Sequence, residues 1–262
     1  MYRFRSKFVK MNSDRKVAII TGAADGIGLA CSQRFNKEGM QVIMADIDYE
    51  RCLQEATKIN AYAIRCDVRS TQDVEQLVAE TINRYQKIDV LINNAAVAIG
   101  GNIIEMDEED WNVVLNTNLT SAYRLIKNVL PHMLKRRSGS VINMCSTQAH
   151  RSWNNWTAYA AAKGALLSMT TQLAGQFGAD NIRFNSISPG TIATPMLQQR
   201  IDKEGKELLE QSVAMHAMNR LGIPEEVAAT AAFLASDEAG FITGIDIKVD
   251  GGLCTLPRYN EK

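Results

Sequence analysis

From Lys16 onward, short apolar runs rich in β-branched residues alternate with longer amphipathic segments. The strand-like runs are KVAII, QVIMAD, AYAIRCD, DVLINN, SVINMCS, RFNSIS and GIDIKVD, and helical patterns such as TQDVEQLVAETINRY lie between them. Strands that are apolar on both faces need helices on both faces, which is typical of a parallel sheet. The alternation therefore predicts an α/β fold with a single doubly wound parallel sheet.

The 262 residues contain no Pro/Gly/Ser-rich linker, no repeat and no break in composition. This length suits one large α/β domain, which we expect to span residues 15–262. The preceding residues 1–14 begin with MYRFRSKFVKMN, which has basic residues and no acid. This segment is shorter than a transit peptide and shows no cleavage pattern. We expect a flexible N-terminal arm or a translation start misplaced upstream of Met11.

Charge and composition exclude several classes of function. Lys plus Arg equals Asp plus Glu at 29 each, so no net field attracts nucleic acid or an anionic membrane. No run approaches the roughly 20 apolar residues of a membrane span. The 5 cysteines and 3 histidines show no metal-ligand spacing. We expect reduced thiols, a cytoplasmic location, no metal site, and neither nucleic acid nor membrane as a partner.

The first strand leads into a glycine-rich turn, TGAADGIG, with glycines at 22, 26 and 28. Glycine permits a tight turn, a close approach of the backbone to a pyrophosphate, and close packing of the next helix on the sheet. The amides at that helix N-terminus could then bind the phosphates. A turn without a ligand would have the same glycines, so the motif alone leaves both interpretations open.

Acidic residues at the next two strand ends favour the ligand. Asp46 ends the second strand, where a carboxylate would accept hydrogen bonds from the adenosine ribose. The CDV motif ends the third strand and places Asp67 near the expected adenine edge. An Asp after a strand is also a common turn residue, but the glycine turn and both acids together indicate a dinucleotide site.

The alanine-rich stretch TAYAAAKGAL predicts a helix with Tyr159 and Lys163 on one face, four residues apart. A phenol has an ordinary pKa of about 10, too high for a base near neutral pH. A neighbouring ammonium would lower that pKa and make Tyr159 an acid/base. Ser146, which ends the expected strand SVINMCS, could bond a substrate oxygen. NMCST lacks the GxSxG pattern of a nucleophilic serine, and no histidine signature accompanies it.

The order of these motifs resembles the short-chain dehydrogenase/reductase family from about Lys16 to Gly252. The matching pieces are TGAADGIG, CDV, NNAA, NTNLT, the Ser146–Tyr159–Lys163 set, SPGTIATPM and the final DGG. The resemblance implies an oxidoreductase with a Rossmann-like fold and a nicotinamide cofactor. It also implies a catalytic tetrad of Asn118, Ser146, Tyr159 and Lys163, with Lys163 on the nicotinamide ribose and a water on the Asn118 backbone relaying protons.

The resemblance extends to the whole cofactor site. The residues it assigns to the dinucleotide are Gly22, Asp25, Gly26, Ile27, Gly28, Asp46, Asp67, Val68, Asn94, Tyr159, Lys163, Pro189, Gly190, Ile192 and Thr194. The chain departs from the family at NNAA, where Ala96 replaces a glycine. A methyl group there could require a small backbone adjustment, but it removes no reactive group.

Two further segments should line the substrate pocket. TQAHRSWNNW follows Ser146, and a lid-like stretch begins at Thr191, after Pro189 and Gly190. With Ser146 and Tyr159, we expect Gln148, His150 and Asn154 to bind the substrate. The expected apolar walls are Trp153, Met196, Leu197, Met215 and Met218. This mixture favours a small polar substrate such as a sugar or polyol, although several of these side chains could instead face solvent or another subunit.

The cofactor should be NAD, because Asp46 would repel a 2′-phosphate and Asp25 would add a second negative charge. The substrate would be a small secondary alcohol or ketone. A 3-oxoacyl-carrier reductase of the same family is the enzymatic alternative, and a non-catalytic dinucleotide-binding scaffold is another. The long helices at about 108–137 and 156–177 carry more apolar positions than one sheet face can cover, and the family pairs such helices between subunits. We therefore expect a homotetramer or homodimer.

Overall fold

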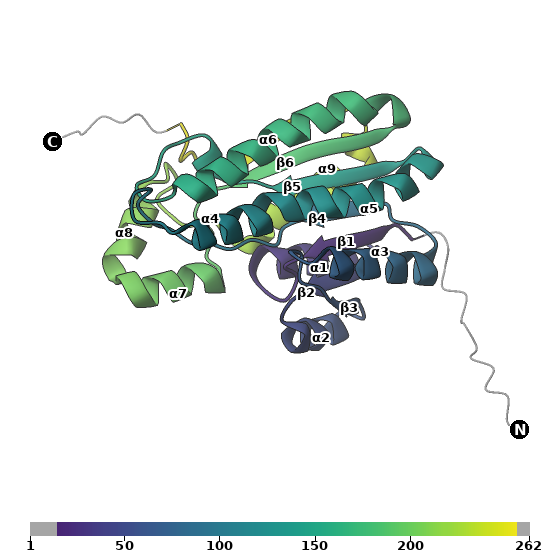
Figure 1. The fold of residues 1–262 in the computed structure, drawn as a ribbon, viewed down its shortest axis with the longest axis horizontal. Coiled ribbons are helices and arrows are strands. Elements are labelled where there is room, and N and C mark those ends of the chain that lie inside the picture. The colour runs from purple at the N-terminus through teal and green to yellow at the C-terminus, as the bar shows by residue number, and fades with distance from the viewer. Residues whose placement is uncertain (1–14, 256–262) are drawn as a thin grey trace, which may run out of the picture.

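The computed structural model describes residues 15–255, and its strands lie side by side in one sheet (Figure 1). They are β1 (Val17–Thr21), β2 (Gln41–Asp46), β3 (Tyr62–Arg65), β4 (Val90–Asn93), β5 (Gly139–Met144), β6 (Ile182–Pro189) and β7 (Asp246–Val249). Their order is β3-β2-β1-β4-β5-β6-β7, and neighbours run parallel. The expected doubly wound α/β sheet is confirmed. The N-terminal arm lies outside the described residues.

Helices cover both faces of this sheet. They are α1 (Gly26–Lys37), α2 (Tyr49–Lys58), α3 (Thr71–Tyr85), α4 (Glu108–Leu115), α5 (Ser121–Arg136), α6 (Thr157–Phe177), α7 (Pro195–Glu204), α8 (Lys206–Ala214) and α9 (Pro224–Ala235). Residues of α1 and α9 share one core cluster with Ala18 and Ile20 of β1, whereas α3 and α5 share the other with Val17 and Ile19. Successive side chains of a strand point to opposite faces of the sheet, so one buried strand contributes to a hydrophobic core on each face. Figure 1 shows α3, α5 and α6 along the same side of the sheet.

Three boundaries differ from those expected. The helix anticipated over 108–137 is interrupted by a π-helical segment, Asn116–Thr120, between α4 and α5. β3 ends at Arg65 and β5 at Met144, so Asp67 and Ser146 lie in the turns beyond the strands. Both turns are fixed by side-chain caps: Ser146 accepts from the Gln148 amide, and Asp73 from the Asp67 amide. Such local bonds compete with the strand ladder and end it.

The seam between β1 and β4 is closed by one buried carboxylate. Asp89, just before β4, accepts from the Val17 amide at 2.8 Å and from Arg136 of α5 at 2.7 Å. Its own amide donates to the Val17 carbonyl.

No helix of the described residues is long and apolar enough to span a bilayer.

Candidate active site

The glycine-rich turn after β1 has no space for side chains. Gly22 and Gly26 have φ of 62° and 52°, a region that favours glycine. A Cβ on Gly28 would lie 2.0 Å from the Gly22 carbonyl oxygen, and a Cβ on Gly22 would lie 2.9 Å from the Ala95 Cα. The backbone of this turn therefore remains bare where a pyrophosphate would approach.

Asn94 holds the turn against the end of β4. Its side-chain amide donates to the Thr21 carbonyl at 2.9 Å and to the Gly22 carbonyl at 3.1 Å. The Thr21 hydroxyl accepts in return from the amides of Asn94 and Ala95. Through these hydrogen bonds Asn94 holds the glycine-rich turn in place. Ala96, which departs from the family pattern, does not have a positive φ, so an alanine fits there without the strain of that backbone region.

The N-terminus of α1 fits a bound phosphate. Asp25 occupies the N-cap position but makes no side-chain cap hydrogen bond. Its carboxylate instead contacts Arg51 of α2 at 2.8 Å. The first-turn amides of α1 are thus left without a side-chain cap, beside a turn that any Cβ at Gly28 would fill. This arrangement suits a dinucleotide pyrophosphate, although the pair with Arg51 offsets the second negative charge expected at Asp25.

The two acids beyond β2 and β3 are engaged by their own loops. Asp46 accepts from the Ala24 amide at 2.9 Å and the Asp48 amide at 3.0 Å. The Asp67 carboxylate bonds the guanidinium and amide of Arg69, and this lowers its pKa. Asp46 therefore joins the β2 end to the glycine turn. Ile27 is half-buried in α1, and Val68 is buried beside Asp67.

Tyr159 and Lys163 lie together on α6, as expected. The Lys163 Nζ is 5.5 Å from the centre of the Tyr159 ring and donates to the Met144 carbonyl at 2.7 Å. Lys163 is 2% exposed. Burial lowers its pKa to about 8 and raises the pKa of Tyr159 to about 12. The expected lowering of the phenol pKa by Lys163 is not found, because desolvation of the phenolate dominates.

Ser146 is oriented for this pair. Its hydroxyl oxygen accepts from the Gln148 amide at 3.2 Å, which leaves its proton available to a second group. A side-chain hydrogen bond with Ser146 lowers the pKa of Tyr159, opposing the larger effect of burial. The turn after β5 and the first turns of α6 therefore bring Ser146 and Tyr159 to one place.

Asn118 lies inside the π-helical segment and is 2% exposed. Its side chain bonds both the amide of Val97, at 2.8 Å, and the carbonyl of Val97, at 2.9 Å. The side chain is thereby committed to the loop after β4. A π-helical turn shifts the backbone hydrogen bonds by one residue and frequently occurs at functional sites. The water relay that the resemblance implies would use the Asn118 backbone rather than this side chain.

The loop after β6 carries the last group of expected cofactor residues. Pro189 ends β6, and Gly190 donates to the Val249 carbonyl. Ile192 is buried and bridges to Gly222. Thr194 caps α7, and its Cγ2 lies 3.3 Å from where a Cβ on Gly26 would be. The start of the lid therefore packs directly against the glycine turn.

The expected substrate residues separate into two groups. Gln148 has a buried Oε1 without a hydrogen-bond partner among the described residues, and the buried Nε1 of Trp153 is likewise unpartnered there. These are an acceptor and a donor that a ligand could satisfy. His150 instead contacts Asp246 at 2.9 Å and Ser188 at 3.2 Å, toward β7 and β6. Asn154 is exposed.

The apolar walls expected from the lid are partly present. Leu197 is buried, Met215 is half-buried, and Met196 and Met218 are exposed. A contact that the sequence does not reveal joins lid and catalytic helix. The Arg200 guanidinium of α7 lies 4.8 Å from the Trp156 ring, which packs edge-on against Tyr159 at 5.7 Å.

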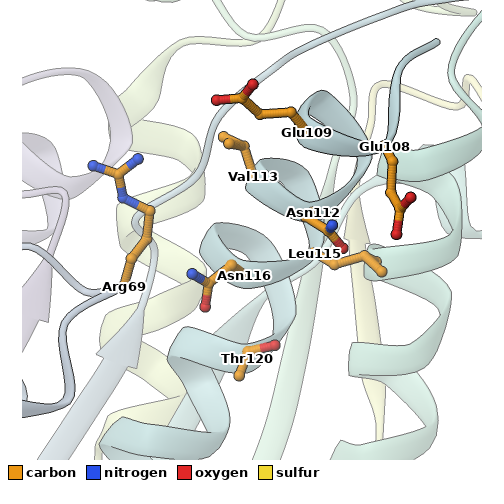
Figure 2. A pocket seen from close by; sticks show the side chains of 8 residues that line it. All are labelled: Arg69, Glu108, Glu109, Asn112, Val113, Leu115, Asn116 and Thr120. Atoms are coloured by element: carbon orange, nitrogen blue, oxygen red, sulfur yellow. The ribbon is translucent and has the colours of Figure 1, made fainter.

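A separate cleft of about 740 Å³ lies beside α4 and contains none of the expected catalytic residues (Figure 2). Figure 2 shows Arg69 facing Asn116 and Val113 across the opening. Its lining residues are Arg69, Glu108, Glu109, Asn112, Val113, Leu115, Asn116 and Thr120. Arg69 is already bonded to Asp67, so we do not assign the chemistry to this cleft.

Three supporting residues escaped the sequence analysis. Arg51 orients Asp25. His216 is 1% exposed, contacts the Ser212 carbonyl through Nδ1 at 2.6 Å, and accepts from the Thr191 amide through Nε2 at 3.0 Å. Asn143 of β5 donates to Thr170 of α6 and so anchors the catalytic helix on the sheet. A polar residue such as Asn143 inside a buried strand is a signal that the sequence offers. The contacts of Arg51 with Asp25 and of His216 with Thr191 join residues that are distant in the sequence.

Comparisons with known proteins agree with this geometry. Residues 22–254 match the family model described as enoyl-(acyl carrier protein) reductase. The 3-oxoacyl-[acyl-carrier-protein] reductase of Thermotoga maritima is 37% identical, over 93% of this chain and 99% of its own length. The meso-2,3-butanediol dehydrogenase of Serratia marcescens is also 37% identical, over 92% and 96%.

Among solved structures, an actinorhodin polyketide ketoreductase crystallised with NADPH superimposes with a TM-score of 0.90. It is 32% identical, and the match covers 94% of this chain and 99% of that one. The two relatives and the solved ketoreductase are named for reactions at CH–OH or keto groups, and the family model is described by an enoyl reductase. The chain is a member of the short-chain dehydrogenase/reductase family of oxidoreductases.

Proposed function

We propose that the protein is an NAD-dependent oxidoreductase that transfers a hydride between nicotinamide and a small secondary alcohol or ketone, such as a sugar or polyol. The observation that carries the proposal is the convergence of Ser146, Tyr159 and Lys163, at the same carboxyl-end edge of the sheet as the bare glycine turn. The Serratia relative, named as a butanediol dehydrogenase, supports a small hydroxy compound.

Each group has a defined task in this proposal. The Ser146 hydroxyl donates to the substrate oxygen and holds it beside Tyr159. Tyr159 takes the hydroxyl proton during oxidation and returns it during reduction. Lys163 keeps one N–H on the Met144 carbonyl, which fixes its ammonium behind the phenol. The nicotinamide supplies the hydride chemistry when bound; Lys163, Pro189, Gly190, Ile192 and Thr194 are the residues proposed to hold that end.

NAD is favoured over NADP at the other end of the site. Asp46 is fixed at the end of β2 by two backbone amides, and the neighbouring Ile47 is exposed and uncharged. A fixed carboxylate accepts from an unmodified ribose and repels a 2′-phosphate. The exposed Ile47 and buried Val68 would flank the adenine, with Asp67 at its edge.

The alternative, reduction of a 3-oxoacyl chain on a carrier protein, is supported by the Thermotoga relative. An acidic carrier needs free cations near the site. In the basic cluster Lys135–Arg137 at the end of α5, Arg136 pairs with Asp89 and Arg137 with Asp180. Two of its three charges are thus compensated within the chain, which favours the small-alcohol proposal.

We also propose a homotetramer or homodimer in the cytoplasm. Tyr123 is the one strongly exposed large hydrophobic residue of α5 and α6 in the described chain, and Leu130, Leu167 and Met169 are half-buried. Support comes from a shallow groove on α6, lined by Ser168, Thr171, Gln172, Gly175 and Gln176. The small side chains among them, Ser168 and Thr171, and the bare Gly175 would let a second helix approach closely. A monomeric mass by light scattering at micromolar concentration would contradict this proposal.

The proposed reaction is tested by a panel of secondary alcohols, sugars, hydroxy acids and an acetoacetyl carrier protein, each with NAD(H) and NADP(H). We expect turnover of a small alcohol with NAD, measured as the rise in absorbance of the reduced cofactor. Efficient reduction of the acetoacetyl carrier with NADPH would establish the alternative. No turnover of any member, despite tight dinucleotide binding, would favour the scaffold.

A further inference from the structure

The Asp25 side chain departs from the usual behaviour of its position. Aspartate at an N-cap normally accepts a hydrogen bond from the second or third amide of the helix. Asp25 makes no such bond and contacts the Arg51 Nη1 at 2.8 Å. The carboxylate is thereby held off the helix end that would receive the cofactor phosphates.

Arg51 reaches this turn from a second part of the cofactor site. Its amide donates to Asp48, which caps α2, and α2 follows directly after Asp46 of β2. Asp46 in turn bonds the amide of Ala24, the residue before Asp25. Glycine turn, ribose carboxylate and guanidinium therefore form one connected group at the adenosine end.

We propose that the Asp25–Arg51 ion pair is the phosphate selector of this protein. Arg51 keeps the Asp25 carboxylate away from the α1 amides, and Asp25 keeps the Arg51 guanidinium away from the ribose 2′ position. The inference rests on the proposed dinucleotide function and goes beyond it by assigning discrimination between NAD and NADP to a pair on two elements.

The two halves of the pair have separate effects. Without Arg51, the Asp25 carboxylate is free to cap α1 and to compete with any phosphate for the same amides. Without Asp25, the guanidinium is released beside Asp46. There it can form bidentate, charge-assisted hydrogen bonds to a 2′-phosphate.

The Asp25–Arg51 ion pair is exposed to solvent, so either side chain can leave the other at little cost in free energy. The side chains of Arg51 and Asp25 are 44% and 41% exposed. Ion pairs this accessible are only weakly stabilising. A substitution should therefore alter ligand binding more than it alters folding.

The test measures binding of two nucleotides to the full-length chain by titration calorimetry, without turnover. 5′-AMP reports on the glycine turn, and adenosine 2′,5′-bisphosphate adds the 2′-phosphate. For Asp25→Ala we expect the dissociation constant of the bisphosphate, relative to that of 5′-AMP, to fall about tenfold. For Arg51→Ala we expect binding of 5′-AMP to weaken about fivefold.

The double variant is the decisive measurement. With Asp25 also removed, Arg51→Ala should bind 5′-AMP about as tightly as the parent, because the competing carboxylate is gone. Arg34→Ala is the matched control, since Arg34 pairs with Glu38 on the outer surface of α1 at similar exposure. This control should leave both dissociation constants within about twofold of the parent.

The outcomes separate the inference from the proposed function. If the parent binds neither nucleotide nor NADH, the proposed function itself fails. If the parent binds 5′-AMP but Asp25→Ala leaves the ratio of the two constants unchanged, the selector role is wrong and the function stands. Failure of the double variant to recover 5′-AMP binding would likewise reject the role of Arg51 in holding Asp25 off α1.

Discussion

The cofactor side and the substrate side of the site are built differently. On the cofactor side, Thr21, Asn94 and the glycine turn bond one another, and closest contacts leave no room for a methyl group. On the substrate side, buried polar atoms of Gln148 and Trp153 lack partners among the described residues. A rigid turn whose polar groups hydrogen-bond one another accepts one ligand shape. Polar side chains that lack a protein partner instead hydrogen-bond to the ligand. The same chain thus combines a fixed dinucleotide frame with a substrate surface that loop changes can alter.

The largest effect should come from the residue that joins the two sides. Tyr159→Phe removes a proton donor and little volume, so we expect kcat to fall about 10²–10⁴-fold while cofactor binding is nearly unchanged. Steady-state kinetics and a cofactor titration measure the two quantities. Activity near that of the parent would reject the acid/base assignment.

Gly28→Ala tests the rigidity of the frame. The added Cβ meets the Gly22 carbonyl at 2.0 Å, so the turn must shift, and overpacking of this kind costs about 1–3 kcal/mol of unfolding free energy. Cofactor affinity should fall with it. Gly178→Ala is the control, because a Cβ there meets nothing within 4 Å and φ is −60°. Equal denaturant midpoints for the two variants would contradict a rigid turn.

The pH dependence should distinguish the two directions of reaction. The pKa of Lys163 is about 8 and that of Tyr159 about 12, so the pair loses its first proton near pH 8. Oxidation needs the pair with one proton lost, in the form that has the Tyr159 phenolate beside the Lys163 ammonium. Its rate should rise about tenfold per unit up to about pH 8, then level off. Reduction needs the protonated pair and should decline above that pH. Identical profiles for both directions would place the titrating group elsewhere.

The smallest effect concerns the link between lid and frame. His216→Phe leaves the Thr191 amide without its acceptor, which should lower the unfolding free energy by about 1–3 kcal/mol. We expect the cofactor KM to rise severalfold and kcat to change little. His216→Gln, whose amide oxygen can still accept, should recover part of the affinity. A loss of kcat alone would show that His216 does not act through the cofactor loop.

Sequence periodicity was sufficient for the sheet because strands covered on both faces leave long apolar runs. The order of the motifs, more than periodicity, indicated Ser146, Tyr159 and Lys163, whose spacing is local to one turn and one helix. The π-helical segment around Asn118 was not anticipated, and the Asn118 side chain bonds Val97, 21 residues away in the loop after β4. Burial reversed the expected pKa shift of Tyr159, and solvent exclusion by distant elements leaves no local sequence signal.

The position of β1 has a consequence for how the protein is made. β1 lies between β2, which follows it, and β4, which is synthesised only after β3 and α3. On the ribosome, one edge of the apolar strand VAIIT therefore waits for residues 90–93 before it can pair. An unpaired strand edge invites association with other nascent chains. Asp89, which reaches the Val17 amide and arrives just ahead of β4, is the first group able to close that edge.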